Sequence, residues 1–366
     1  MTMDVTASCV VTPPYSSLKD LVNFFDGTLS APIAVEWEIT MRCNLRCIHC
    51  CFAAGTPRSN ELTQEESKRV IAEMAQLGVF SIGFTGGEPL TRSDFLDIAA
   101  FARDKGLKLA LNTNGTLIGK KNARRITSLF SEIQVSLDGA KPETHDFIRA
   151  QRGAFERAVR GIRELKEAGA NVVINTTLMK PNQQEVTDIL ALAVELKVDT
   201  YRAIPVRQLG RATENSLELS VNEFAEIYAT LDRLRLRFKD KIYMQLSAVP
   251  SLLDRFLEDG FSCPAAIIKC CIGPDGSVKP CDAFDIFYGG NIREQSLKDI
   301  WLHSPAFQSF RQSILEIVSP ECRLCAFGYR CRGGCKGLAF LYYGTLNRPD
   351  PLCAEIKMQQ QEAVGA

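Results

Sequence analysis

Hydrophobic and polar positions follow two patterns along the middle of the chain. Short apolar runs predict six strands, at residues 33–41, 79–84, 107–111, 132–137, 171–178 and 200–204. Between them lie amphipathic stretches that predict helices at residues 63–77, 92–105, 120–130, 154–168 and 184–196. Several of these helices stop at a glycine, as at Gly78, Gly106 and Gly169, and glycine is a common signal for a helix C-terminus.

This alternation of strands and helices predicts parallel βαβ units, with functional loops after the strand C-termini. Six units are about two short of a closed eight-stranded barrel, so we expect a partial (β/α)6 barrel over residues 33–247. A helix over 221–238 and a short strand at 241–246 would close this region. Residues 1–32 would then form an N-terminal extension, 248–262 a linker and 356–366 a C-terminal tail.

The composition adds a restriction on partners and location. Hydrophobic residues make up 46% of the chain, and 43 basic residues balance 43 acidic ones, so no overall charge favours nucleic acid or an anionic membrane. No apolar run is long enough to cross a bilayer, and the start lacks the pattern of a secretory signal. We therefore expect a cytoplasmic protein with reduced thiols, in which 14 cysteines favour metal binding over disulfides.

The first group of cysteines follows directly on the first predicted strand. Cys43, Cys47 and Cys50 are separated by three and two residues, so one loop can wrap them around one inorganic cluster. Three thiolates on a four-iron cube leave one iron open, and an open position is what a reactive metal centre needs. A structural zinc knuckle or plain buried cysteines are the alternatives, and His49 is a further candidate ligand.

A second motif, Gly86-Gly87-Glu88-Pro89, follows the second predicted strand. Paired glycines permit a close approach of the backbone, and the acid can accept bonds from an ammonium group. Three cysteines after strand one and this motif after strand two make the chain resemble the radical SAM superfamily. The resemblance implies a [4Fe–4S] cluster on the three cysteines, with the amine and carboxylate of S-adenosylmethionine (SAM) on the fourth iron and the second motif against the SAM amine.

The resemblance extends along the barrel. It implies that Asn114, Ser136 and Asp138, which end strands three and four, lie at the SAM site, with Ser136 near the ribose. It also implies that Arg149 pairs with the SAM carboxylate and that His49 stacks near the adenine. Plain turn chemistry is the alternative for Ser136 and Asp138, and a solvated helix charge is the alternative for Arg149.

The remaining cysteines are concentrated between residues 263 and 355. Asp275-Gly276 predicts a β-hairpin turn before Cys281. The spacing resembles the SPASM extension of radical SAM proteins, which implies two auxiliary [4Fe–4S] clusters. Cys263, Cys281 and Cys335 would hold the first, together with Cys270 or Cys271, of which only one can point to it, or with neither if the fourth position is open. The second would use four further cysteines: Cys322, Cys325, Cys331 and Cys353. Zinc ribbons are the alternative.

The family likeness implies an enzyme that uses an external electron donor of the flavodoxin or ferredoxin type to cleave SAM reductively. The resulting 5′-deoxyadenosyl radical would abstract a hydrogen atom from a substrate carbon, and the auxiliary clusters could make the reaction oxidative. Asp282, beside Cys281, is the candidate proton acceptor, although a solvated charge is the simpler interpretation. With about 30 residues before strand one, we expect no built-in precursor-binding domain, so a separate recognition protein, or none, would serve a peptide substrate.

The substrate is not fixed by these motifs. Maturation of a ribosomally made peptide, by crosslinking, oxidation or epimerisation, is the leading hypothesis. Modification of a tetrapyrrole side chain in haem or haem d1 synthesis is the second hypothesis. A non-catalytic iron–sulfur electron carrier is the third, and the intact SAM motif argues against it.

Overall fold

The computed structural model describes residues 29–246, 263–282, 287–316, 319–325, 328–351 and 353. The expected linker at 248–262 and tail at 356–366 lie outside these residues, as does most of the expected N-terminal extension. No helix in the described part of the chain is long and apolar enough to cross a membrane.

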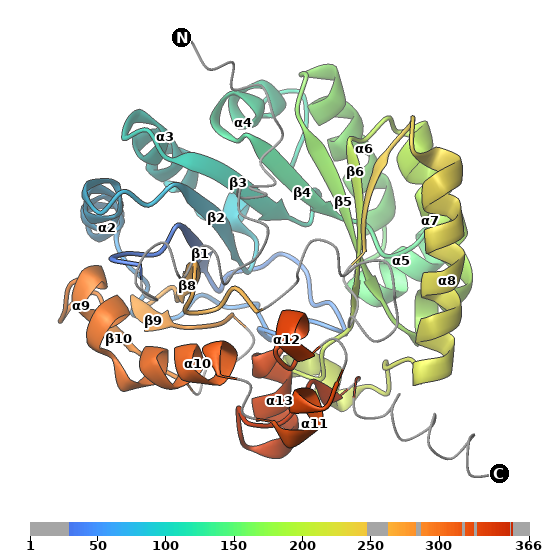
Figure 1. Cartoon of the computed structure of the whole chain (residues 1–366). Helices are drawn as coiled ribbons and strands as arrows, with labels where there is room; N and C mark the ends of the chain where they lie inside the picture. Colours follow the sequence, from blue (N-terminus) through green and yellow to red (C-terminus); the bar gives the residue numbers. More distant parts are fainter. Residues whose placement is uncertain are drawn as a thin grey trace, which may run out of the picture.

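Seven parallel strands form the wall of an open barrel (Figure 1). They are β1 (Ala34–Thr40), β2 (Ser81–Gly86), β3 (Lys108–Thr113), β4 (Glu132–Ser136), β5 (Val172–Leu178), β6 (Thr200–Pro205) and β7 (Tyr243–Leu246), and they pair in chain order. Helices that follow the strands cover the outer face: α2 (Gln64–Gln76), α3 (Phe95–Asp104), α4 (Ala123–Leu129), α6 (Ala154–Glu167), α7 (Val186–Glu195) and α8 (Val221–Phe238). The fold class expected from the sequence is confirmed.

One helix was not expected. α5 (Pro142–Arg149) stands between β4 and α6 and begins with a proline in its first turn, where the missing N–H costs no hydrogen bond. It ends at Ala150, which adopts a left-handed backbone with φ of 52°. Asp146 of this helix accepts the backbone N–H groups of Gly153 at 2.5 Å and Phe155 at 2.8 Å, and so it fixes the start of α6.

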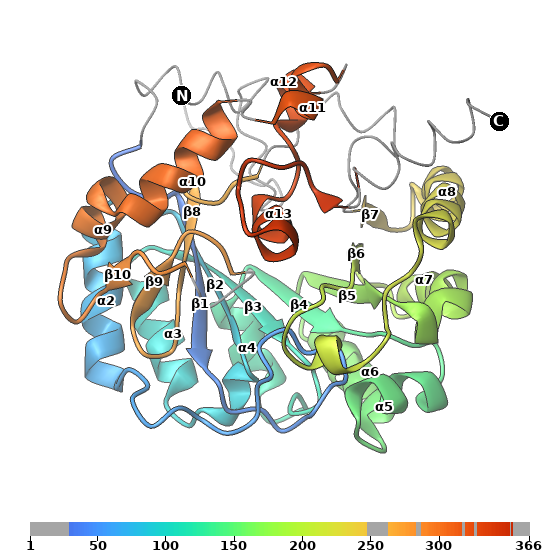
Figure 2. The ribbon, with the colours of Figure 1, turned by 90° about the horizontal axis from the view of Figure 1, so that it is seen from below.

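The cysteine-rich part continues the barrel sheet. The predicted hairpin is present as β8 (Lys269–Ile272) and β9 (Ser277–Lys279), and β8 pairs in parallel with β1. With β10 (Gly290–Asn291), the sheet has ten strands in the order β10-β9-β8-β1-β2-β3-β4-β5-β6-β7. The helices that follow are α9 (Leu297–His303), α10 (Pro305–Leu315), α11 (Pro320–Arg323), α12 (Gly328–Cys331) and α13 (Lys336–Tyr343). Figure 2 shows α13 over the open side of the barrel.

The two faces of the strands differ in character. On β1, Val35, Trp37 and Ile39 point outward into the hydrophobic core beneath the helices, where Trp37 stacks on Phe84. Their neighbours Glu36, Glu38 and Thr40 therefore face the barrel interior, because strand side chains alternate. The buried ion pair of Glu38 with Lys279 of β9, at 2.8 Å, then lies inside the barrel and ties β9 to β1.

Candidate functional site

The loop that carries Cys43, Cys47 and Cys50 follows β1 and is anchored at both ends. The backbone N–H of Cys43 donates to the carbonyl of Gly55 at 2.9 Å, and the N–H of Gly55 donates to the carbonyl of Met41 at 2.8 Å. Arg211, in the short helix η3 (Gly210–Glu214) after β6, holds the other side of the loop. Its Nε donates to the Cys47 carbonyl at 2.8 Å, and its backbone N–H donates to the Cys50 carbonyl at 3.0 Å.

The three thiols face one another closely enough to interact. Burial raises the pKa of Cys43 to about 11, and the charges that Cys47 and Cys50 would carry raise it further. Burial also raises the pKa of Cys47, against the effect of Arg149. Among the described residues, no three His, Cys, Asp or Glu side chains converge as a single metal ion would require. Thiolates are the ligands of iron–sulfur clusters in proteins, and three of them on one loop suit such a cluster.

The end of β3 fixes the same loop from another direction. The side chain of Asn114 donates to the Oδ1 atom of Asn44 at 2.9 Å and accepts the hydroxyl of Thr116 at 2.6 Å. The amide of Asn44 donates in turn to the Thr116 hydroxyl at 2.9 Å. Asn44 stands between Cys43 and Leu45, so this closed set of bonds sets the position of the first cysteine.

Gly86 and Gly87 lie where no side chain would fit. A β-carbon at Gly87 would be 2.1 Å from the carbonyl oxygen of Arg42, and one at Gly86 would be 2.5 Å from that of Thr40. Gly86 also has a φ of 112°, which other residues rarely adopt. The two glycines therefore let the end of β2 lie directly against the start of the cysteine loop.

Glu88 is fully buried, and its carboxylate is used within the protein. It accepts the hydroxyl of Thr113 at 2.8 Å, the backbone N–H of Asn114 at 2.7 Å and that of Leu90 at 3.2 Å. Burial raises its pKa to about 7 against these hydrogen bonds. Glu88 thus joins the ends of β2 and β3, and the buried Pro89 begins the short helix η1 (Pro89–Thr91) behind it.

Asp138, Arg149 and His49 form a buried charged group beside Cys47. The guanidinium of Arg149 contacts the Asp138 carboxylate at 2.5 Å and donates to Sγ of Cys47 at 3.7 Å, and Nε2 of His49 lies 3.6 Å from Asp138. Burial alone would raise the pKa of Asp138, but the charge of Arg149 outweighs it and lowers the pKa. Burial lowers the pKa of His49 to about 4, so its imidazole is neutral at pH 7.

Three buried polar atoms of this group have no hydrogen-bond partner among the described residues. They are Nε of Arg149, which is a donor, Nδ1 of His49, and Oδ2 of Asp138, which faces Arg149 only in the ion pair. Because a buried polar atom without a partner is costly, this arrangement suits a ligand that offers an acceptor such as a carboxylate beside Arg149. The residues here therefore fit both an iron–sulfur cluster and SAM. Ser136, half-buried at the end of β4, pairs in register with Asn175 of β5 and is not joined to the group by a hydrogen bond.

The first auxiliary set comes together from distant segments. Each of three thiols raises the pKa of another through the charge that it would carry. Cys281 acts on Cys263, Cys335 acts on Cys281, and Cys263 acts on Cys335. In each case burial is the larger cause. These three thiols, which we call the inner set, are brought together as the sequence resemblance implied.

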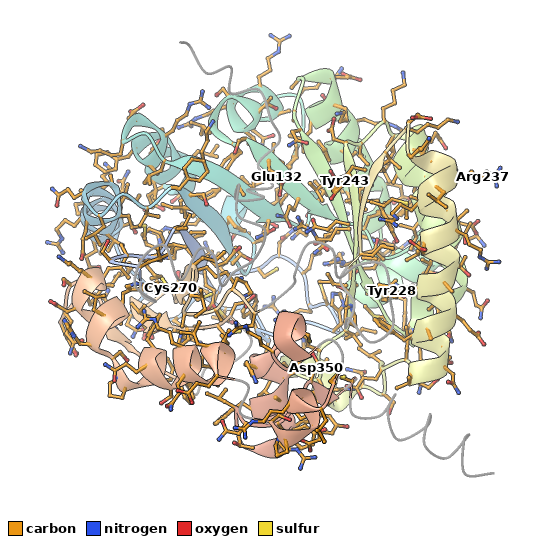
Figure 3. The ribbon with its side chains drawn as sticks, in the orientation of Figure 1. Glu132, Tyr228, Arg237, Tyr243, Cys270 and Asp350 are labelled. Atoms are coloured by element: carbon orange, nitrogen blue, oxygen red, sulfur yellow. The ribbon has the colours of Figure 1, made fainter. Side chains whose placement is uncertain are left out.

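Cys270 does not join the inner set, which removes one of the two candidates for a fourth ligand of that set. It is fully buried on the outward face of β8, in the hydrophobic core near Arg311, and no other cysteine affects its pKa (Figure 3). Cys271 points the opposite way, as alternation requires, and its pKa is raised by burial and by Asp282. The physical reason is register: Cys270 pairs with Val35, whose side chain faces the helices.

The second auxiliary set lies around α11 and α12. Burial raises the pKa of Cys331 to about 11, and the charges that Cys353 and Cys322 would carry raise it further. Cys325 follows one turn after Cys322, and its backbone N–H donates to the Cys322 carbonyl at 3.3 Å. We call Cys322, Cys325, Cys331 and Cys353 the outer set. No disulfide joins any of the 13 cysteines that the structure describes.

Asp282 lies among charged groups beside the inner set, and its side chain is 30% exposed. Its carboxylate accepts from the thiol of Cys281 at 3.6 Å and lies 3.9 Å from Arg207. Burial would raise its pKa, but Lys269 and Arg207 hold the pKa well below its usual range. Lys269 is on the interior face of β8, so Asp282 connects the inner set to the barrel interior.

The sequence reasoning missed the polar interior itself. The pKa of Glu36 is affected by the charges of four groups from separate segments: Lys269, Asp282, Arg202 and Glu132. Burial is nevertheless the main cause, and it raises the Glu36 pKa. Gly83 leaves room for this carboxylate, since a β-carbon there would be 2.7 Å from Oε2 of Glu36. The alternation of charged and apolar residues on β1 was the available signal.

Comparisons with known proteins agree with this geometry. Residues 37–193 match the radical SAM superfamily, and residues 263–326 match SPASM, an iron–sulfur cluster-binding domain. An AdoMet-dependent heme synthase of Methanosarcina barkeri is 32% identical over 88% of this chain and 97% of its own length. The mycofactocin maturase MftC of Mycolicibacterium smegmatis is 31% identical over 92% of this chain and 86% of its own length.

Solved structures show the same fold. Streptococcus suis SuiB bound to the precursor peptide SuiA has a TM-score of 0.77 at 18% identity, over 96% of this chain and 84% of that one. AdoMet-bound anSMEcpe has a TM-score of 0.72 at 19% identity, over 89% of this chain and 95% of that one. The chain therefore belongs to the radical SAM superfamily and carries a SPASM domain. It is an enzyme of a family whose cofactors are SAM and a [4Fe–4S] cluster, as the sequence implied.

Replacing Gly87 with alanine should weaken SAM binding. The new β-carbon would overlap the Arg42 carbonyl and displace the end of β2 from the cysteine loop. We expect Gly87→Ala to raise the dissociation constant of SAM at least about tenfold, a loss of about 1.4 kcal/mol. Gly119→Ala is the matched control, because a β-carbon there meets nothing within 4 Å. Equal affinities of the two reconstituted variants, measured anaerobically by calorimetry, would refute this role.

The buried carboxyl of Glu88 should make stability depend on pH. Its pKa is about 7 in the fold and 4.5 as a free side chain, so the native state holds the proton more tightly. The stability contributed by the protonated form is complete below pH 4.5 and is lost as pH rises through 7. We expect the free energy of unfolding of the reduced metal-free protein, measured with urea, to fall between pH 5 and 8. The fall should be about 3 kcal/mol larger than that of Glu88→Gln. Parallel profiles of the two proteins would contradict the assignment.

Proposed function

We propose that this enzyme cleaves SAM reductively and removes a hydrogen atom from a carbon of a ribosomally made peptide. A cluster held by Cys43, Cys47 and Cys50 would supply the electron, and SAM bound beside it would supply the 5′-deoxyadenosyl radical. The residues of the chain have other tasks. Arg149 and Asp138 bind and orient SAM beside Cys47, Asn114 and Glu88 hold the loops that surround it, and His49 and Ser136 line the adenosine side.

The observation that supports a substrate site is the polar barrel interior between two sets of thiols. The cysteine loop follows β1, whereas Cys281 of the inner set follows β9, which is joined to β1 through β8 in the same sheet. Between them the wall presents Glu36, Lys269 and Asp282. On the other side of the barrel, Arg202 of β6 donates hydrogen bonds to Gln134 of β4 at 2.6 Å and to Gln245 of β7 at 2.9 Å. A substrate held there would lie between SAM and the first auxiliary cluster.

The lining favours a peptide. Amides and charges of both signs suit the donors and acceptors of a peptide backbone, whereas a flat apolar macrocycle needs extensive apolar walls. Two further findings support this choice. The mycofactocin maturase is a relative across most of this chain, and SuiB shares the fold in complex with a precursor peptide.

Asp282 is our proposed proton acceptor in an oxidative reaction, in which an auxiliary cluster takes the electron. Its low pKa keeps it ionised at neutral pH, and this also makes it a weak base while Lys269 and Arg207 face it. A substrate group that draws either cation away would raise the basicity of Asp282 at the moment of binding. We further propose a flavodoxin or ferredoxin as electron donor, a separate protein for peptide recognition, and a reducing, cytoplasmic setting.

The test is co-expression with short peptides encoded beside the gene, followed by mass spectrometry. We expect a mass change in one peptide and, with that peptide deuterated, transfer of deuterium into 5′-deoxyadenosine. Asp282→Asn should still cleave SAM but form product at least about tenfold more slowly, in the range that general base catalysis supplies. Equal product formation by this variant would remove Asp282 from the reaction. Unmodified peptides throughout would count against a peptide substrate.

The second candidate is a tetrapyrrole side chain. It is favoured by the 32% identity to the heme synthase across 97% of that protein. Incubation of the anaerobic protein with iron coproporphyrin should then shift the porphyrin absorbance and consume SAM. Under the peptide proposal we expect no shift, and no 5′-deoxyadenosine above the level without substrate.

A further inference from the structure

Lys336 places a buried ammonium group between the inner and outer thiol sets. It follows Cys335 directly, begins α13 and is 1% exposed. Its Nζ donates to the carbonyl of Leu346 at 3.2 Å. The described residues give it no carboxylate to offset its charge; the anionic groups near it are cysteines. A buried ammonium with one carbonyl acceptor is costly unless other negative groups face it.

The cysteines that face Lys336 come from both sets. Cys263 belongs to the inner set, whereas Cys322 and Cys331 belong to the outer set. Burial lowers the pKa of Lys336, and the charges that these three thiols would carry oppose that effect. The backbone N–H of Lys336 also donates to the Cys263 thiol. The same residue therefore contacts the inner set through its backbone and faces the outer set through its side chain.

Gly333 supplies independent evidence for this placement. A β-carbon at this glycine would lie 2.8 Å from Nζ of Lys336 and 3.6 Å from Sγ of Cys322. The residue has a φ of 93°, so the bend that brings the ammonium towards the outer set depends on glycine. The lack of a side chain at Gly333 leaves room for the ammonium beside this sulfur.

We propose that Lys336 is a positioning residue whose fixed positive charge makes both auxiliary clusters easier to reduce. This inference rests on the proposed cluster ligands. Each one-electron reduction adds a negative charge between the cysteines, and a nearby ammonium stabilises that charge. By Coulomb's law, one unit charge within several ångströms changes such an equilibrium by about tenfold or more at a moderate effective dielectric. One residue would thus adjust both centres in the same direction.

The test is a reductive titration of the anaerobic holoenzyme followed by electron paramagnetic resonance. In Lys336→Met, which keeps the length and loses the charge, the reduced-to-oxidised ratio of both auxiliary clusters at a fixed potential should fall about tenfold. Lys336→Arg should stay within about threefold of the wild type, since it retains the charge. Lys298→Met, on the exposed face of α9, is the matched control and should change nothing. The cluster at Cys43, Cys47 and Cys50 should be unchanged in every variant and serves as an internal reference.

The failures of the two proposals can be told apart. About twelve iron atoms per chain in the wild type, with ratios that Lys336→Met leaves unchanged, would overturn the role of Lys336 and spare the clusters. A measured content of about four iron atoms per chain would mean that the auxiliary clusters are absent, and it would also overturn this role of Lys336. If Lys336→Met fails to retain iron, Lys336→Gln takes its place, because an amide can still donate to Leu346. If both neutral variants lose iron, retention by Lys336→Arg supports the need for a charge, and loss in that variant also would contradict it.

Discussion

The site depends on how closely the ends of β1 and β2 approach. The carbonyl of Arg42 occupies the place where any side chain at Gly87 would begin, and Gly86 is held equally close to Thr40. This contact sets the cysteine loop against the motif that follows β2. Glu88 then fixes the end of β3 by accepting hydrogen bonds from Thr113 and Asn114. Asn114 in turn donates a hydrogen bond to Asn44 of the cysteine loop. Three strand ends and one loop are thus fixed as a unit.

Buried charges account for much of the remaining architecture. Arg149 and Asp138 pair beside Cys47, Lys279 pairs with Glu38 inside the barrel, and Asp282 faces Lys269 and Arg207 near the inner set. Breaking a buried pair costs several kcal/mol because it leaves an uncompensated charge, so such groups hold their geometry firmly. Charges of this kind suit a site in which a reactive radical must meet one substrate carbon. They also explain how β8 and β9 are fixed to the barrel although they come late in the chain.

Local patterns in the sequence were enough to predict the barrel strands, most of their helices and the hairpin before Cys281. They did not predict α5, because eight residues that begin at Pro142 give too short a periodic signal. The choice between Cys270 and Cys271 stayed open because the register of β8 against β1 is a contact between distant segments, and only that register shows which of two adjacent cysteines faces inward. Arg211 had no motif around it. Charged and apolar residues alternate strictly along β1, so the sequence alone could have predicted its interior carboxylates.

The central claim is that three thiols after β1 hold the cluster at which SAM is cleaved. The direct measurement is 5′-deoxyadenosine release by anaerobically reconstituted protein with Cys43, Cys47 and Cys50 all replaced by alanine. Cys51→Ala is the control, since that half-buried thiol lies next to Cys50 but is not one of the proposed ligands. The account predicts that the triple variant loses about four iron atoms and all SAM cleavage, while Cys51→Ala keeps both. Release of 5′-deoxyadenosine by the triple variant at the wild-type rate would contradict it.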